Sequence, residues 1–231
     1  MAKRTDAETL SSHLHALLRD DLLNGEWAPG AKLQLTTLST RYETSSTVVR
    51  EALTRLTGER LVTLVPNRGF FVPELSLAAL QDITELRCVN EEFGLKMAIE
   101  RGSLAWESEL IAVHHTLERT PYREDNEDAS LTPGWVKAHQ AFHSKLIEAS
   151  GIPPLIDLCT TLSDVTQLYN RWAGTATRFV GRDVAQEHRE ILQATLDRDA
   201  ALAARLIRKH YEITLHAIED NGAALEAASQ A

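Results

Sequence analysis

Two histidines of this 231-residue chain, His139 and His143, are four residues apart, so a helix would place both on one face. The same face carries Trp135, Phe142 and Leu146, which predicts that it is buried. His188 and His210 also lie among apolar residues at helical spacing, so we expect four imidazoles in one interior.

Burying four polar rings costs free energy unless each nitrogen finds a partner. A divalent metal ion would satisfy the rings of His139, His143, His188 and His210 together, and imidazole suits Zn²⁺, Ni²⁺ or Cu²⁺. The alternative is four separate core histidines, each with its own hydrogen bond. His114 lies on a similar apolar face and is not assigned as a ligand, and His216 lies among charged residues and is expected to be exposed.

The segment from His139 to His143 reads HQAFH and has the histidine spacing of the metalloprotease motif HExxH. Gln140 stands where that motif has its glutamate general base, and an amide cannot accept a proton at neutral pH. We therefore expect no enzyme. Two alternatives stay open: a metal-dependent hydrolase that uses these histidines, and a helical interaction protein that binds no effector.

The N-terminal third contains residues suited to contacts with DNA. A helix is predicted near 9–24, short helices near 35–42 and from 45 onward, and a hairpin around the turn at 66–69. This order is typical of a winged helix-turn-helix, whose second short helix can enter the major groove. The predicted DNA contacts are Thr36, Ser45, Ser46, Thr47, Arg50, Arg68 and Gly69. The alternative is an amphipathic surface helix followed by a solvated turn.

From Ser76 onward the pattern is helical throughout, with helices expected near 76–101, 105–119, 133–149, 153–173, 182–197 and 199–220. The predicted fold class is mainly α, with an N-terminal winged helix-turn-helix and a C-terminal antiparallel bundle of about six helices. The predicted domains are 1–74 for DNA binding, 75–222 for effector and metal binding and dimerisation, and 223–231 as a flexible tail.

The charge is unevenly distributed along the chain, whose net charge is −9. Residues 1–73 are close to neutral and the rest is strongly acidic, which fits a DNA-contacting head on a body that repels phosphate. No apolar run is long enough to span a bilayer, the N-terminus lacks the apolar core of a secretory signal, and the two cysteines lack metal or disulfide spacing. We expect a cytoplasmic protein without a membrane partner.

Three segments in order, NGEWAPGAKL, ETSSTVVREALTRL and LVTLVPNRGFFV, resemble the winged helix of the GntR family. The resemblance covers roughly 9–73 and implies a homodimeric transcriptional regulator, usually a repressor, that binds double-stranded operator DNA. Ser46 stands where the family usually has arginine, and Val48 where proline is common, which puts the usual operator sequence in doubt.

The body resembles the FCD effector domain of FadR-type GntR regulators. The matching residues are Arg87 with Glu91, HQAFH, the stretch from His188 to Asp197, and His210. The resemblance implies a metal held by one acidic residue and three histidines, with His139 here in place of the usual aspartate. It also implies a small organic-acid effector, bound by Arg87 beside the metal, with zinc the expected ion and nickel possible. The alternative for Arg87 and Glu91 is a surface ion pair worth a few tenths of a kcal/mol.

Overall fold

The structure, a computed structural model, describes residues 2–123, 131–174 and 182–229. The chain divides into two compact units, Met1–Ser76 and Leu77–Ala231. Each unit is described by itself.

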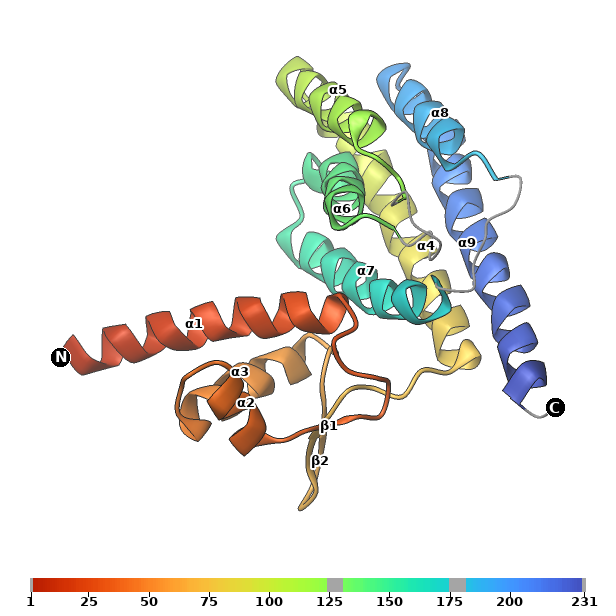
Figure 1. The fold of residues 1–231 in the computed structure, drawn as a ribbon. Helices are drawn as coiled ribbons and strands as arrows, with labels where there is room; N and C mark the ends of the chain where they lie inside the picture. The colour runs from red at the N-terminus through yellow and green to blue at the C-terminus, as the bar shows by residue number, and fades with distance from the viewer. Residues whose placement is uncertain (1, 124–130, 175–181, 230–231) are drawn as a thin grey trace. The chain divides into compact units, whose positions relative to one another are not determined.

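The first unit consists of three helices and a small antiparallel sheet (Figure 1). Its elements are α1 (Ala2–Leu23), β1 (Lys32–Leu33), α2 (Leu35–Arg41), α3 (Ser46–Gly58), β2 (Thr63–Val65) and β3 (Gly69–Phe71). The strand order is β1-β3-β2. The predicted winged helix-turn-helix is therefore confirmed, with a third strand, β1, that the sequence interpretation missed.

The recognition helix of such a fold is α3, and its sequence defines both its start and its buried face. The Ser45 side chain caps the helix by accepting a hydrogen bond from the Val48 amide at 3.4 Å. The apolar residues Val49, Ala52, Leu53 and Leu56 are buried, and α3 packs against α1. The residues between them face solvent, so α3 offers a polar surface on a fixed support.

The wing turns at Pro66 and Asn67. The Arg68 amide donates to the Val65 carbonyl at 3.0 Å, which closes a β-turn with proline second and Asn67 in the left-handed region at φ 60°. Gly69 follows at φ 101°, a conformation that favours glycine. The turn predicted at 66–69 is therefore where the sequence indicated.

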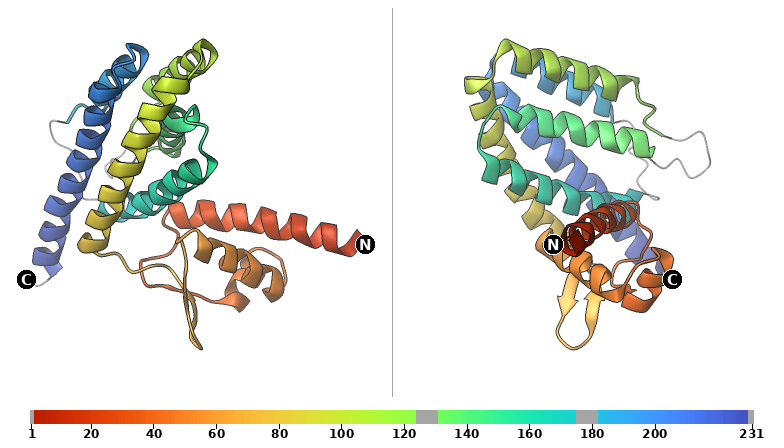
Figure 2. Two further views of the ribbon diagram at one scale, coloured as in Figure 1. Left: turned by 180° about the vertical axis from the view of Figure 1, so that it is seen from behind. Right: turned by 90° about the vertical axis from the view of Figure 1, so that its left-hand side faces the viewer.

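The second unit is a helical bundle, and each of the six predicted helices is present. They are α4 (Leu77–Arg101), α5 (Leu104–Arg119), α6 (Pro133–Glu148), α7 (Pro153–Gly174), α8 (Val184–Leu196) and α9 (Ala200–Ser229). The long helices α4 and α9 lie side by side, with α8 against α9 and α5 against α6 (Figure 2). Phe142, Leu146, Leu95 and Leu110 are completely buried in the core between these helices.

Capping residues explain why the site-bearing helices begin where they do. Thr132 accepts from the Trp135 amide at 3.1 Å before Pro133 at the first turn of α6. Asp183 accepts from the Gln186 amide at 2.8 Å at the start of α8. These caps set the starting points from which His139, His143 and His188 project inward.

Two predicted ends were wrong. The helix expected to end near 220 continues through Ser229 as α9, because AALEAAS consists largely of strong helix formers. The first helix begins at Ala2 rather than near Thr9. In the described part of the chain, no helix has both the length and the apolar character needed to cross a bilayer.

Candidate metal centre and nucleic-acid interface

The four predicted ligands come together inside the bundle from three helices. His139 and His143 lie on α6, His188 on α8 and His210 on α9. Each offers one ring nitrogen, and these four atoms all lie within 4.8 Å of one another. His139 is half-buried, whereas the other three are buried.

His139 and His143 are the closest pair, with their Nε2 atoms 3.1 Å apart. The His188 ring centroid lies 5.0 Å from that of His139 and 4.9 Å from that of His210. The His139 ring also stacks on Trp135 at 4.6 Å, which fixes its plane. Tetrahedral zinc–nitrogen bonds of about 2.0–2.1 Å need nitrogens about 3.3 Å apart, so the cluster would close slightly around an ion.

His188 has a buried nitrogen without a partner. Its Nε2 makes no hydrogen bond to any described residue. A buried unsatisfied polar atom costs about 1–3 kcal/mol, and the His188 ring lies among the rings of His139, His143 and His210. This observation fits a ligand better than a hydrogen-bonded core histidine.

Tyr211 on α9 determines the tautomer of His143. The Tyr211 hydroxyl donates to the Glu91 carboxylate and lies 2.8 Å from His143 Nδ1. Burial, and then the charge of Glu91, raises the pKa of Tyr211 well above its ordinary value, so the hydroxyl keeps its proton. Its oxygen must then accept from His143 Nδ1–H, which leaves the Nε2 lone pair facing His139.

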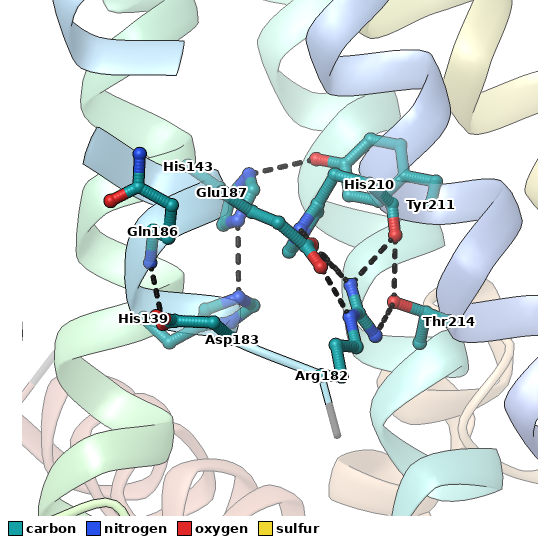
Figure 3. A network of polar contacts seen from close by, with 9 residues as sticks. All are labelled: His139, His143, Arg182, Asp183, Gln186, Glu187, His210, Tyr211 and Thr214. Atoms are coloured by element: carbon teal, nitrogen blue, oxygen red, sulfur yellow. Dashed lines mark hydrogen bonds and ion pairs between the residues drawn. The ribbon is translucent and has the colours of Figure 1, made fainter. Parts of the chain in front are cut away.

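Glu187 determines the tautomer of His210 in a similar way (Figure 3). His210 Nδ1 lies 2.7 Å from the Glu187 carboxylate, which Arg182 holds from its other side with contacts of 2.6 and 2.7 Å. Burial opposes ionisation of Glu187, but the hydrogen bonds from Arg182 and His210 outweigh it and lower its pKa to about 2. The ionised carboxylate therefore accepts a hydrogen bond from His210 Nδ1–H, which leaves His210 Nε2 free to face the cluster.

The pKa values of all four imidazoles are lowered, which favours their neutral form. Burial is the largest cause that lowers the pKa of His139, His143, His188 and His210, and the charges of nearby arginines add to it, whereas the hydrogen bond to Glu187 opposes it at His210. Metal ligation requires neutral imidazole. Four neutral nitrogens with two of the rings fixed in tautomer could hold Zn²⁺ or Ni²⁺.

A cleft of about 870 Å³ of empty space, partly open to solvent, adjoins the cluster. His139 and His210 line it together with Arg87, Arg123 and Arg182. Amide side chains of Gln140, Gln167 and Asn170 lie in the same lining. The cleft thus combines cations with groups that both donate and accept hydrogen bonds, which suits an oxygen-rich anion.

Arg87 pairs with Glu91 as the spacing suggested, at 2.9 Å. The pair is buried, with Arg87 6% and Glu91 2% exposed, so the alternative of a surface ion pair is wrong. The guanidinium also lies over the Tyr211 ring at 4.1 Å and reaches the cleft. Arg87 is therefore the link between the cleft and the Tyr211–His143 contact.

Sequence reasoning missed Arg182, Glu187 and Tyr211. Glu187 and Tyr211 are chain neighbours of the candidate ligands His188 and His210, and this adjacency was the one signal that could have found them. Arg182 lies just before α8 and has no such signal. Two histidines that were considered and not assigned as ligands lie where we expected them: His114 is buried against Phe142 outside the cluster, and His216 is exposed.

The predicted DNA-contacting residues lie on the surface of the first unit. Arg50 is exposed on α3 and has no ion pair with another described residue. Arg68 is exposed at the wing turn, with its guanidinium 5.6 Å from the Phe71 ring centroid. Thr36, Ser45, Ser46 and Thr47 are exposed and Gly69 is half-exposed. Ser45 is engaged as the cap of α3 and Ser46 lies 3.1 Å from the Ser39 hydroxyl, so their hydroxyls are shared with local contacts.

Comparison with known families gives two matches. Residues 10–72 match the family described as bacterial regulatory proteins, gntR family, and residues 82–213 match the FCD domain. The second match covers more than half of the chain and includes Arg87 and all four clustered histidines.

Two individual relatives are HTH-type transcriptional regulators. The chain is 32% identical to the HTH-type transcriptional repressor GlaR of Escherichia coli K12, over 84% of this chain and 88% of that protein. It is 30% identical to the HTH-type transcriptional regulator BphR of Paraburkholderia xenovorans LB400, over 89% of this chain and 83% of that protein. Among solved structures, E. coli McbR/YncC superposes with a TM-score of 0.76 at 20% identity, over 91% of this chain and 97% of that chain. A GntR regulator from Rhodococcus sp. RHA1 superposes with a TM-score of 0.70 at 23% sequence identity, over 91% of this chain and 97% of that chain. These two structural similarities show the fold.

Proposed function

Because this chain belongs to the GntR family of bacterial transcriptional regulators and carries their FCD domain, we propose that it is a metal-dependent, homodimeric repressor released or retained by a small organic acid. That it is a DNA-binding regulator with an effector-binding domain follows from the family. The metal, the effector class, the dimer and the residue roles are the proposal. In this proposal, residues 1–74 bind operator DNA in the cytoplasm. Residues 75–222 bind the metal and the effector and form the dimer.

The four-imidazole cluster beside a cationic cleft is the observation that carries the proposal. His139, His143, His188 and His210 would hold zinc or nickel, and the unpartnered Nε2 of His188 supports this. When bound, the ion supplies a positive charge that can take an oxygen of an anionic ligand. His139 in place of the aspartate usual in the family leaves the site with one negative charge fewer, which favours an anionic effector.

Arg87 would orient the effector. Its guanidinium lies at the cleft and can hold a carboxylate with two parallel hydrogen bonds. Gln140, Gln167 and Asn170 would take hydroxyl or carbonyl groups of the same molecule. This lining supports hydroxy acids, sugar acids or dicarboxylates over an apolar ligand.

On the DNA side, Arg50 and the hydroxyls at the start of α3 would contact the major groove, while Arg68 and Gly69 would approach the backbone at the wing. Thr36 would contribute a backbone contact from the start of α2. An effector that prefers one dimer arrangement would shift the spacing of the two α3 helices and thereby change operator affinity.

Gln140 argues against the hydrolase alternative. Its amide nitrogen donates to Asp164 at 3.1 Å and to Gln167 at 2.7 Å, and an amide so held supplies no general base to the clustered histidines. We propose that the chain is not an enzyme.

The proposal is tested by metal analysis and DNA binding on one preparation. Purified protein should contain about one zinc or nickel ion per chain, and a gel shift on the DNA upstream of its own gene should change with an active acid but not after chelation. A thermal-shift screen of hydroxy acids, sugar acids and dicarboxylates should identify that acid, and Arg87→Gln should abolish its shift. An effector response that persists in metal-free protein would remove the metal from the mechanism.

A further inference from the structure

A second cavity lies beside the candidate metal centre, between α5 and α8. These two helices contact each other at the end of the bundle that is uppermost in Figure 1. The cavity, which we call the α5–α8 cavity, is lined by residues of the segments 114–122 and 182–188 and by Trp135 of α6. It contains about 960 Å³ of empty space, partly open to solvent, and the candidate ligand His188 forms part of its lining.

The walls of the α5–α8 cavity are largely apolar and aromatic. Leu117, Tyr122, Trp135 and Val184 contribute to them. The rings of Tyr122 and Trp135 meet edge-on, with their centroids 4.6 Å apart. Aromatic rings favour edge-to-face or offset contacts with further rings, and small-molecule sites typically enclose about 300–1,000 Å³. A planar aromatic group of a small molecule therefore suits these walls.

Two buried histidines, His114 and His188, also line the α5–α8 cavity. Both rings contact the Phe142 ring edge-on, with centroids 5.3 and 5.4 Å from it. Burial among apolar rings disfavours the charged form of an imidazole. The two histidines therefore offer no ion pair to a bound molecule, and an uncharged group fits beside them.

The charges of the α5–α8 cavity differ from those of the cleft beside the cluster. The cleft is lined by three arginines and by no carboxylate of a described residue. The α5–α8 cavity is lined by Glu118 and Asp183, and Arg189 pairs with both at 3.0 and 3.9 Å, so one cation serves two carboxylates. Arg182 lines both spaces and is paired with Glu187 at 2.6 Å. An acid group is therefore attracted to the cleft and disfavoured in the α5–α8 cavity.

The two spaces are neighbours. Tyr122, Trp135, Arg182 and Val184 line both of them. The Trp135 ring also stacks on the ring of His139, with centroids 4.6 Å apart. A molecule that is held in the cleft can thus extend past Trp135 into the α5–α8 cavity.

We propose that the α5–α8 cavity binds an aromatic, uncharged part of the same effector whose acid group is held in the cleft. The effector class then narrows from hydroxy acids, sugar acids and dicarboxylates in general to acids that carry an aromatic ring. This inference rests on the proposed function and adds a second part to its ligand site. A ring bound there would contact Trp135, which in turn stacks on the candidate ligand His139.

Binding of a ring without an acid group tests the α5–α8 cavity by itself. Ala185 lines the cavity at an exposed position, so Ala185→Phe fills space there without changing the core. Benzyl alcohol should bind full-length wild-type protein in a ligand-observed NMR titration. Its dissociation constant should rise by about tenfold or more in Ala185→Phe, the loss expected when one ring is no longer buried.

Ala112→Phe is the matched control, because Ala112 is an exposed residue of α5 that lines neither space. This variant should bind benzyl alcohol as wild type does. Benzyl alcohol that fails to bind wild type, or that binds equally to all three proteins, would overturn the proposal.

Pairs of acids that differ only in a ring test the connection to the effector. In calorimetric titrations phenyllactate should bind about tenfold or more tightly than lactate, and phenylsuccinate than succinate. Ala185→Phe should remove this difference and keep the affinity for the ring-free acids. Equal affinities within both pairs in wild type would overturn the inference and leave the proposed acid effector in place. Protein that binds benzyl alcohol but none of the four acids would support the aromatic site and contradict the proposed acid effector.

Discussion

The hydroxyl of Tyr211 bridges His143 on α6 and Glu91 on α4, donating to the carboxylate and lying 2.8 Å from the imidazole Nδ1. This contact joins the first helix of the bundle to the candidate metal centre through one side chain of α9. It also fixes which nitrogen of His143 faces the other three rings.

Tyr211→Phe removes that contact and keeps the ring. His143 Nδ1–H then has no acceptor in Tyr211, its preferred tautomer is lost, and zinc affinity should fall by about 10–100-fold. Competition with a chromophoric chelator measures this. Tyr122→Phe is the matched control, because Tyr122 also lines the cleft but contacts Trp135 edge-on rather than a candidate ligand. Equal zinc affinity in wild type and Tyr211→Phe would show that the hydroxyl does not position His143.

The stability of the chelated protein should depend on pH through the clustered histidines. Their pKa values are lowered in the folded protein, so below about 6.5 the unfolded chain binds more protons than the folded one. The contribution of these histidines to the free energy of unfolding is complete above that pH. It is lost as the pH falls, at up to about 1.4 kcal/mol per pH unit for each histidine. Thermal midpoints should therefore be level above pH 7.5 and fall steeply from 6.5 to 5.

The contribution of Glu187 lies outside that window. With a folded pKa of about 2 against an ordinary 4.5, its stabilisation is present above 4.5 and is lost only below it. A midpoint that stays constant between pH 6.5 and 5 would therefore contradict the lowered pKa values of the four imidazoles rather than the Glu187 ion pair.

Arg50→Ala should separate DNA binding from folding. Arg50 is exposed and has no ion pair with another described residue, so the free energy of unfolding should stay within about 0.5 kcal/mol of wild type. Loss of a phosphate or guanine contact should weaken operator binding by about 1–3 kcal/mol in fluorescence anisotropy. Arg205→Ala, an exposed arginine of α9, serves as control and should bind DNA normally. Operator affinity that is unchanged in Arg50→Ala would remove Arg50 from the interface.

Arg68→Ala should weaken DNA binding in a different way from Arg50→Ala. If Arg68 contacts phosphate at the wing, binding weakens similarly for all sequences, and the slope of log affinity against log salt becomes shallower by about one. A loss confined to one operator position, with the slope kept, would indicate that Arg68 reads a base instead.

The sequence predicted the order of helices and the inward faces well, because helical periodicity and breaks at glycine and proline are local signals. His139 and His143 were predictable as a pair since four-residue spacing guarantees a shared face. The meeting of His188 with His210 was not derivable in the same way, because it depends on how α8 and α9 pack against α6. The resemblance to the FCD domain supplied that information.

Other features depend on contacts between distant residues. Strand β1 contains two residues and exists because it pairs with β3, some 38 positions later, so no local pattern indicated it. Tyr211, Glu187 and Arg182 have ordinary sequence surroundings, and their roles follow from which helices face one another. The Arg87–Glu91 pair was predictable as a contact, but its burial was not.

A calorimetric titration of Zn²⁺ into chelated full-length protein tests the central claim most directly, with His188→Ala and His114→Ala as a matched pair of buried-histidine variants. The account predicts one ion per chain for wild type and for His114→Ala, and an affinity at least about tenfold weaker for His188→Ala. Binding that is absent in wild type, or equal in all three proteins, would contradict it.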